Sequence, residues 1–404
     1  MRTRLALIVA ALAGALAGGL IMLSLPTSGS VAPAKKSGTG MEAEGVAETR
    51  LLGKAPITTI LAWTPGGLPP GLAGAAHAIP GVSAVAEIRS GIAWLSSWAN
   101  RDEAPVTAPA GLAIPVEVAA VDPEQYATFV PPSERARFLE LSRGGALLGQ
   151  AGSRLRGVDS QGSLQFGDTD IGILGVVADE LIGGHEFIVS TATGAFAGIT
   201  TPRYLLISLT EEASRSLVED ELRRALPPGT RVRVRAPGET PVFRHGDAVL
   251  SISQIKELFG EFAARPGPDG TIQINPDWVE SNIATVSVPL LGTVRCHKAV
   301  IPQLTAALEE ISRRGLGGLV RAGDFGGCYS PRFLNRDEEA GLSHHAWGIA
   351  LDLNVSENPF GAEPSLDPRL VEILERWGFA WGGRWLMPDG MHFEFLRWPL
   401  GPKG

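Results

Sequence analysis

The chain has little cysteine and no excess of positive charge. Its 404 residues include two cysteines, Cys296 and Cys328, too few for a metal site built from several thiolates. Lysine and arginine number 35 against 43 aspartates and glutamates, so the net charge of −8 gives no reason to expect a nucleic-acid partner. No internal repeat is evident. A single apolar run is long enough to span a bilayer, which disfavours a permease with several membrane helices.

Glycine and proline, by contrast, are abundant. The 50 glycines and 30 prolines favour many turns and short strands over long helices. A hydrophobic fraction of 44% is ample for globular cores, and the length of 404 residues predicts two or three domains.

The N-terminus has the features of an export segment. Arg2 and Arg4 precede an uncharged apolar run over residues 5–25, long enough to cross a membrane as a helix. This length favours an uncleaved signal anchor, with a cleaved signal peptide as the alternative. We therefore predict a signal anchor or signal peptide at residues 1–28 and a flexible linker at residues 29–52. Both alternatives place the rest of the chain outside the cytoplasm, anchored to the membrane or secreted.

Residues 53–262 alternate between strand-like and helix-like segments, which predicts a separate α+β domain. The strand-like segments are 57–61, 116–121, 187–190, 204–207 and 230–235, and the helix-like segments are 134–141 and 211–226. This region contains His77, His185 and His245, which are isolated from one another in the sequence. We interpret each as an ordinary surface or core histidine, and we find no catalytic pattern here.

A proline- and glycine-rich connector at residues 264–270 precedes a C-terminal domain predicted over residues 271–404. Asp367 followed by Pro368 is typical of a helix start, and Gly378 can end that helix. We expect a small antiparallel sheet with flanking helices, so that the whole chain is of the α+β class.

Two segments of this domain combine strand alternation with metal-binding side chains. Asp352 lies on the polar face of a predicted strand whose other face is apolar, and His392 and Glu394 share the polar face of a second strand. If the two strands pair, His392 and Asp352 meet, and His345 can reach them from the preceding loop. Two imidazoles and one carboxylate with an open fourth position are the ligand set of a catalytic zinc site, so we predict one Zn²⁺ per chain.

The same segments contain candidates for the remaining catalytic roles. Asp389 lies three residues before His392, where it can act as general base and proton shuttle without being a ligand. Glu394 and Ser343 are predicted to support the ligands. Arg332 is the candidate partner for the oxyanion that forms on a scissile carbonyl. His344, beside a predicted ligand, is not expected to be one.

Together these motifs resemble those of a known enzyme family. Ser-x-His-x-x-Gly-x-Ala-x-Asp, followed further along by Pro-Asp-x-Met-His-Phe-Glu, resembles the VanY-type D-alanyl-D-alanine carboxypeptidases and L-alanyl-D-glutamate endopeptidases over residues 275–400. The resemblance implies a zinc peptidase that cuts peptidoglycan stem peptides in a bacterial cell envelope. It implies the zinc ligands His345, Asp352 and His392, with Asp389 as the catalytic acidic residue and Arg332 facing the substrate.

The middle domain has a looser resemblance. Gly145–Gly149, Phe166–Asp168 and Ile173–Val177 make it similar to the extracytoplasmic domain of MacB/FtsX-type permeases over about residues 55–235. In those families the domain is a non-catalytic module, and its partner in this chain is unknown.

The cysteines and tryptophans complete the predictions for the C-terminal domain. Outside the cytoplasm an even pair of cysteines often forms a disulfide, and a Cys296–Cys328 bridge would hold the loop that contains Arg332. Most tryptophans are interpreted as core residues, although one could line a substrate groove. The candidates are Trp377, Trp381, Trp385 and Trp398.

Two functions from different classes follow. The first is a zinc peptidase that acts on peptidoglycan stem peptides, either as a D-alanyl-D-alanine carboxypeptidase or as an endopeptidase of the L-alanyl-D-glutamate type. The second is a membrane-tethered cell-wall binding or scaffold protein whose peptidase fold is vestigial. In both cases the expected contacts are the cell wall and, through the N-terminal segment, the membrane.

Overall fold

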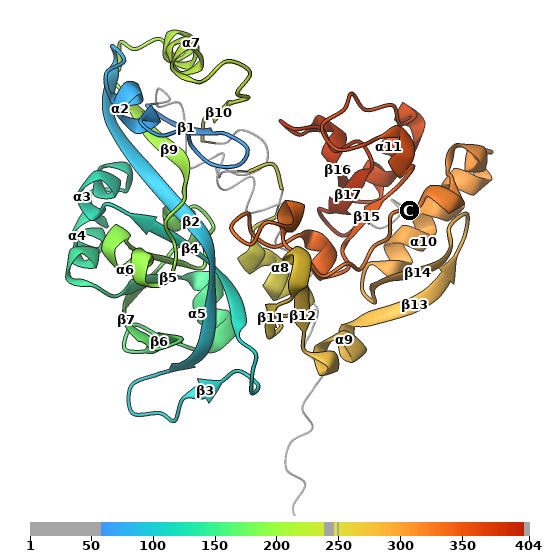
Figure 1. The fold of residues 1–404 in the computed structure, drawn as a ribbon, viewed down its shortest axis with the longest axis horizontal. Helices are drawn as coiled ribbons and strands as arrows, with labels where there is room; N and C mark the ends of the chain where they lie inside the picture. The colour runs from blue at the N-terminus through green and yellow to red at the C-terminus, as the bar shows by residue number, and fades with distance from the viewer. Residues whose placement is uncertain (1–57, 238–245, 249, 400–404) are drawn as a thin grey trace, which may run out of the picture. The chain divides into compact units, whose positions relative to one another are not determined.

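The computed structural model describes residues 58–237, 246–248 and 250–399. The predicted export segment, the linker and His245 lie outside the described residues. Within those ranges, no helix combines the length and apolar character needed to cross a membrane. The fold is α+β, as predicted, with one large mixed sheet and several small antiparallel sheets (Figure 1).

The middle domain is built on the large sheet. Its strands are β1 (Thr59–Trp63), β2 (Val82–Ala99), β3 (Val106–Thr107), β4 (Ile114–Val121), β5 (Ala146–Gly149), β6 (Ser163–Phe166), β7 (Thr169–Val177), β8 (Phe187–Ser190), β9 (Pro202–Leu209) and β10 (Arg233–Arg235). Its α-helices are α2 (Leu72–His77), α3 (Pro123–Tyr126), α4 (Arg135–Leu139), α5 (Gln150–Arg156), α6 (Thr191–Phe196) and α7 (Arg215–Ala225). Short 3₁₀ turns are η1 (Ala127–Phe129), η2 (Glu140–Arg143) and η3 (Asp179–Ile182).

The long strand β2 organises this sheet, and Figure 1 shows it crossing the domain. The strand order is β10–β1–β9–β2–β4–β8–β5–β7–β6, and β6 pairs back onto the end of β2. Six strands, β2, β4, β8, β5, β7 and β6, therefore close into a ring. One apolar cluster, which includes Leu95, Val116 and Phe187, is built from strands of this ring. Separate clusters pack α3 and α4 on one side and α2 and α7 on another.

The C-terminal domain has smaller sheets. Its strands are β11 (Ala264–Pro266), β12 (Ile272–Ile274), β13 (Ile283–Val288), β14 (Gly292–His297), β15 (Ala350–Asp352), β16 (Phe379–Trp381) and β17 (His392–Phe395). Its α-helices are α8 (Ile252–Phe259), α9 (Pro276–Asn282), α10 (Ile301–Arg313) and α11 (Pro368–Arg376). Its 3₁₀ turns are η4 (Pro268–Gly270), η5 (Gly317–Leu319), η6 (Ala322–Asp324), η7 (Leu334–Arg336), η8 (His344–Ala346), η9 (Val355–Glu357) and η10 (Gly382–Arg384).

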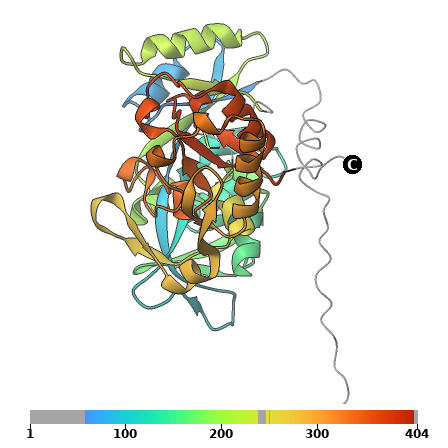
Figure 2. The same cartoon turned by 90° about the vertical axis from the view of Figure 1, so that its right-hand side faces the viewer.

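One apolar core unites these elements, and it begins earlier in the chain than residue 271. Ile255 and Phe259 of α8 are buried in it together with α10, α11 and the sheet β15–β17–β16. Helix α8 starts at a capping box in which Ser251 and Gln254 exchange hydrogen bonds with each other's backbone. By its packing, the segment from residue 250 to 264 thus belongs with the C-terminal domain. The hairpin of β13 and β14 can be followed in Figures 1 and 2.

The expected small antiparallel sheet is present and has β17 at its centre. Helix α11 begins where the sequence predicts, because the Asp367 side chain accepts a hydrogen bond from the Arg369 backbone and Pro368 occupies the first turn. Leu370 and Leu374 face the core from this helix. The sheet is therefore backed by apolar packing on one side, which leaves its other face for polar side chains.

Candidate metal centre

Two strands and one turn bring the predicted ligands together. Strands β15 and β17 pair antiparallel in a register that places Asp352 directly opposite His392. His345 lies in η8, where the Ser343 side chain accepts a hydrogen bond from the His345 backbone. Gly348 then turns the chain towards β15 with φ of 67°, and an added Cβ would lie 2.8 Å from the His297 backbone nitrogen. All three predicted ligand side chains are buried.

The three ligand atoms form a nearly equilateral triangle. His345 Nε2 lies 3.2 Å from Asp352 Oδ1, and His392 Nδ1 lies 3.1 Å from the same oxygen. The two ring nitrogens are 3.3 Å apart. A tetrahedral zinc ion with ligand distances of about 2.05 Å requires about 3.3 Å between its ligand atoms. The donor set and its spacing therefore fit zinc.

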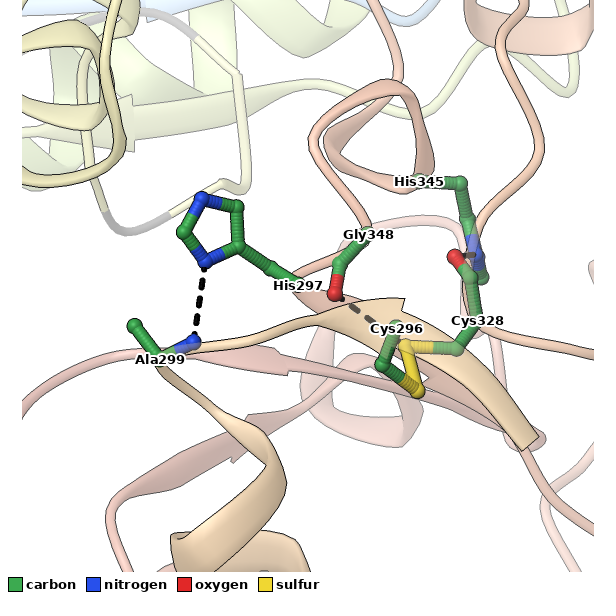
Figure 3. The surroundings of a disulfide bond; sticks show 6 residues. All are labelled: Cys296, His297, Ala299, Cys328, His345 and Gly348. Atoms are coloured by element: carbon green, nitrogen blue, oxygen red, sulfur yellow. Dashed lines mark hydrogen bonds between the residues drawn. A yellow bond between two sulfur atoms is a disulfide. The ribbon is translucent and has the colours of Figure 1, made fainter. Parts of the chain in front are cut away.

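A backbone carbonyl next to the disulfide sets the orientation of His345. Its Nδ1 lies 2.9 Å from the Cys328 carbonyl oxygen, so Nδ1–H donates there and Nε2 faces the triangle. Cys328 is bonded to Cys296 of β14, with Cα atoms 5.2 Å apart, and Figure 3 shows His345 beside this bridge. The bridge anticipated from the sequence is thus present. It fixes the segment that orients one ligand.

Glu394 connects the other ligand to a second histidine. Its carboxylate is buried and lies 3.5 Å from His392 Nε2 and 2.7 Å from His344 Nδ1. His344 therefore points away from the triangle, as expected for a residue that is not a ligand. Burial alone would raise the pKa of Glu394, but His344 and His392 hold that pKa well below its usual range. Glu394 is therefore ionised, and its negative charge lies beside Nε2 of His392, whereas Nδ1 of the same ring belongs to the ligand triangle.

The charges of the three candidate ligands depend on one another. Burial lowers the pKa of His345, so its imidazole is neutral, and both histidines hold the pKa of Asp352 below its usual range despite burial. Burial would also lower the pKa of His392, but hydrogen bonds to Asp352 and Glu394 raise it to about 10. A positive charge is therefore favoured inside the triangle. A metal cation bound by the three ligands would supply such a charge.

Asp389 and Arg332 lie beside the ligands. Asp389 Oδ1 is buried and has no hydrogen-bond partner among the described residues, which leaves it available for a water or a substrate group. Burial raises the pKa of Asp389 to about 6. Burial has the opposite effect on Arg332 and lowers its pKa, although the nearby charges of Asp352 and Asp389 oppose this shift. Arg332 Nη1 donates to Ser343 Oγ at 3.0 Å, which connects it to the cap of η8.

One tryptophan lies against the candidate site. The Trp385 ring is 5.0 Å from the His392 ring. Trp381 and Trp377 instead donate to Gly390 and Glu310, and Trp398 packs on Phe395.

An open depression of about 660 Å³ lies next to the residues that precede Arg332. It is lined by Ile274, Pro276, Val279, Glu280, Arg295, Tyr329 and Pro331.

His77 and His185, the two middle-domain histidines that the structure describes, do not join this site. His185 is buried and stacks on Tyr204, and His77 is exposed at the end of α2. Within the described residues, the group that could hold a metal through three or more acidic, histidine or cysteine side chains is His345, Asp352 and His392.

Comparison with known sequence families points to the same segment. Residues 336–395 match the D-alanyl-D-alanine carboxypeptidase family. This carboxypeptidase match contains the three candidate ligands, Asp389 and Glu394, whereas Arg332 lies just before it. A comparison with curated proteins finds no match.

Two solved structures are similar at low identity. The periplasmic region of MacB from Actinobacillus actinomycetemcomitans is 8% identical, with a TM-score of 0.32, over 46% of this chain and 94% of that one. The extracellular domain of the noncanonic ABC-type transporter YknZ from Gram-positive bacteria is 12% identical, with a TM-score of 0.29, over 44% of this chain and 98% of that one.

Proposed function

We propose that the C-terminal domain is a zinc peptidase that hydrolyses peptidoglycan stem peptides. The observation that carries the proposal is the triangle of His345, Asp352 and His392, whose atoms are spaced for zinc, inside a segment that matches the D-alanyl-D-alanine carboxypeptidase family. A zinc ion held there would polarise a scissile carbonyl and lower the pKa of a bound water. The substrates are stem peptides, and the N-terminal segment would keep the enzyme in the cell envelope.

In this proposal Asp389 acts first as general base and then as general acid. Its ionised carboxylate takes a proton from the attacking water as the C–O bond forms, and it returns that proton to the leaving amine as the C–N bond breaks. The raised pKa of about 6 suits both steps, because the group is ionised near neutral pH yet holds a proton readily.

Arg332 stabilises the charge that develops on the carbonyl oxygen. Its guanidinium keeps a positive charge beside Asp352 and Asp389, and its hydrogen bond to Ser343 limits its orientations. Trp385, next to His392, can contact the apolar part of a bound peptide. In this proposal only His345, Asp352 and His392 bind the metal, and Asp389, Arg332 and Trp385 do not.

The test uses the full chain, its zinc content and defined muropeptides. The wild type is incubated with pentapeptide muropeptides that end in D-Ala-D-Ala, with and without chelator, and products are identified by mass spectrometry. Loss of one terminal D-alanine indicates a carboxypeptidase, and cleavage after L-alanine indicates an endopeptidase. Chelation should abolish turnover, and zinc should restore it.

Variants separate a metal site from a fold that merely binds the cell wall. His345→Ala should lose bound zinc and turnover together, whereas His77→Ala, an exposed histidine in the middle domain, should keep both. A wild type that binds zinc and muropeptides but cleaves neither bond would refute the peptidase proposal. That result would support the cell-wall scaffold instead.

A further inference from the structure

Two loops border the candidate metal centre. The first, residues 334–342, lies between Arg332 and Ser343 and is closed by a bridge between Phe333 and Leu342. The second, which we name the Trp385 loop, comprises residues 382–391 and contains both Trp385 and Asp389. Each loop makes polar contacts with the middle domain.

The first loop is held at its tip and at its base. Glu339 Oε2 accepts a hydrogen bond from Thr201 Oγ1 at 2.8 Å, and the Glu339 carbonyl accepts one from the Arg203 guanidinium. At the base, the Trp94 ring of β2 meets the Phe333 ring edge-on, with centroids 6.4 Å apart. Phe333 is the residue after Arg332, so these contacts restrict the segment that positions the arginine.

The Trp385 loop is held at Leu386 through both of its backbone groups. The Leu386 N–H donates to Asp247 Oδ2 at 2.8 Å, and its carbonyl accepts from Arg231 Nη1 at 2.9 Å. The Leu386 side chain packs against the middle-domain cluster that includes Leu61 and Trp63. Leu386 thus links the middle domain to the residue that touches His392.

The carboxylate that holds Leu386 is itself fixed. Asp247 Oδ1 lies 2.6 Å from Arg233 Nη1 and 3.5 Å from Arg235 Nη2, both on β10. Its side chain is only 9% exposed, so solvent competes weakly for these bonds. Hydrogen bonds to charged groups are among the stronger ones in proteins. Asp247 therefore transmits the position of β10 to the Trp385 loop.

A buried ionic cluster fastens the two domains behind these loops. Lys256 of α8 lies 2.8 Å from Glu186 and 2.9 Å from Glu261, and Arg156 of α5 lies 2.6 Å from each glutamate. Two positive and two negative charges balance, and burial is tolerated only because each charge is paired. The helix α8 of the C-terminal core is thereby docked on the middle domain, which gives the loop contacts a fixed base.

We propose that the middle domain is a positioning element for the peptidase site, in which Arg231 and Asp247 hold the Trp385 loop and so place Asp389 and Trp385 beside His392. This proposal rests on the proposed peptidase function. Arg231 and Asp247 act through Leu386 and contact neither substrate nor metal ligands, so they are positioning residues. They would give the middle domain a role in the proposed peptidase reaction.

The experiment compares Asp247→Ala and Arg231→Ala with Arg224→Ala in the full chain. Arg224 is an exposed arginine of α7 whose ion pair with Glu221 stays within that helix, which makes it a matched control. Zinc affinity, kcat and KM are measured together with hydrogen–deuterium exchange in peptides that cover residues 382–391.

Loss of either contact should speed exchange in the Trp385 loop by about tenfold or more, while peptides of β15 and β17 stay protected. The kcat should fall by about tenfold to a hundredfold, because a catalytic group displaced by about 1 Å loses much of its effect. Zinc affinity should stay unchanged, since the three ligands lie outside the loop, and any rise in KM through Trp385 should be smaller than the fall in kcat. Asp247→Asn, whose amide oxygen can still accept from Leu386, should recover part of the loss.

Exchange and kcat that match the control in both alanine variants would overturn the proposal. Faster exchange with unchanged kcat would also overturn it, because the loop would then move without consequence. Should Asp247→Ala fail to fold, the exposed Arg231 provides the decisive variant. A wild type that hydrolyses no muropeptide would instead refute the proposed function, and the exchange measurements would still decide whether the middle domain holds the loop.

Discussion

Replacement of Asp389 by asparagine tests the proposed base most directly. The Asp389 carboxylate is raised to a pKa of about 6 by burial, and the nearby charges of Asp352 and Glu394 add to this while His392 and Arg332 oppose it. With this pKa, about 90% of the wild type has the ionised base at pH 7 and about 10% at pH 5. The wild-type kcat/KM should therefore rise by up to about tenfold between pH 5 and pH 7. A bound cation lowers the pKa, so the midpoint should lie at or below about 6.

The Asp389→Asn variant should lose most of its turnover. It should also lose the fall in kcat/KM at acidic pH, which is the acid limb of the pH profile. Asparagine occupies a similar volume but cannot take a proton, so kcat should fall by about 10²- to 10⁴-fold, and the remaining rate should no longer titrate near pH 6. Zinc content should match the wild type, because Asp389 contributes no atom to the ligand triangle. Asp277→Asn, an exposed aspartate in the first turn of α9, is the matched control and should behave as the wild type.

The assay is a pH series of initial rates with zinc measured at every pH. Turnover of Asp389→Asn within about threefold of the wild type, with the acid limb intact, would refute the base assignment. If the limb has a slope near two and zinc is lost at the same pH, protonation of the ligands is responsible instead.

Three further changes test the frame of the site. Lys256→Met removes one of the two cations paired with Glu186 and should lower the free energy of unfolding by about 3–5 kcal/mol in urea. Lys256 and Arg156 hold the pKa of Glu186 below its usual range, so the stability that this pair contributes is present at neutral pH and lost on acidification, and the variant should differ least from the wild type in acid. Replacing Cys296 and Cys328 by serine opens a loop of 32 residues and should cost about 3–4 kcal/mol, with weaker zinc binding in a chelator competition. Arg332→Ala should reduce kcat by about 10²- to 10³-fold at unchanged zinc content.

The candidate ligands were predictable from the sequence because strand alternation is a local property. Asp352 and His392 each occupy the polar face of a strand whose other face is apolar, and the pairing of β15 with β17 then brings them opposite each other. The motif also predicted that His345 is a ligand and that His344 is not. In the structure His345 faces Asp352, whereas His344 faces Glu394. The strand that contains Asp352 is only three residues long, and Asn354 follows it with a left-handed backbone at φ of 51°.

The contacts between the domains could not be predicted in the same way. Leu386 meets Asp247 across 139 residues, and neither residue stands in a pattern that specifies a distant partner. Lys256 is buried although lysines are mostly exposed, and the positions of Glu186, Glu261 and the Pro115 carbonyl make this burial tolerable. Such contacts depend on how two domains dock, and periodicity within one segment contains no information about docking.

The alanine of the Gly-x-Ala-x-Asp motif has a steric reason in this sheet. Glu394 lies at the centre of the three strands, directly opposite Ala350 on β15 and Ala380 on β16. Two small neighbours leave room above the sheet for the His344 imidazole to reach the Glu394 carboxylate. A larger side chain at either position would compete for that space, and Glu394 would lose the partner that helps to keep it ionised behind His392. The spacing of the motif therefore encodes the support of the metal ligands as well as the ligands themselves.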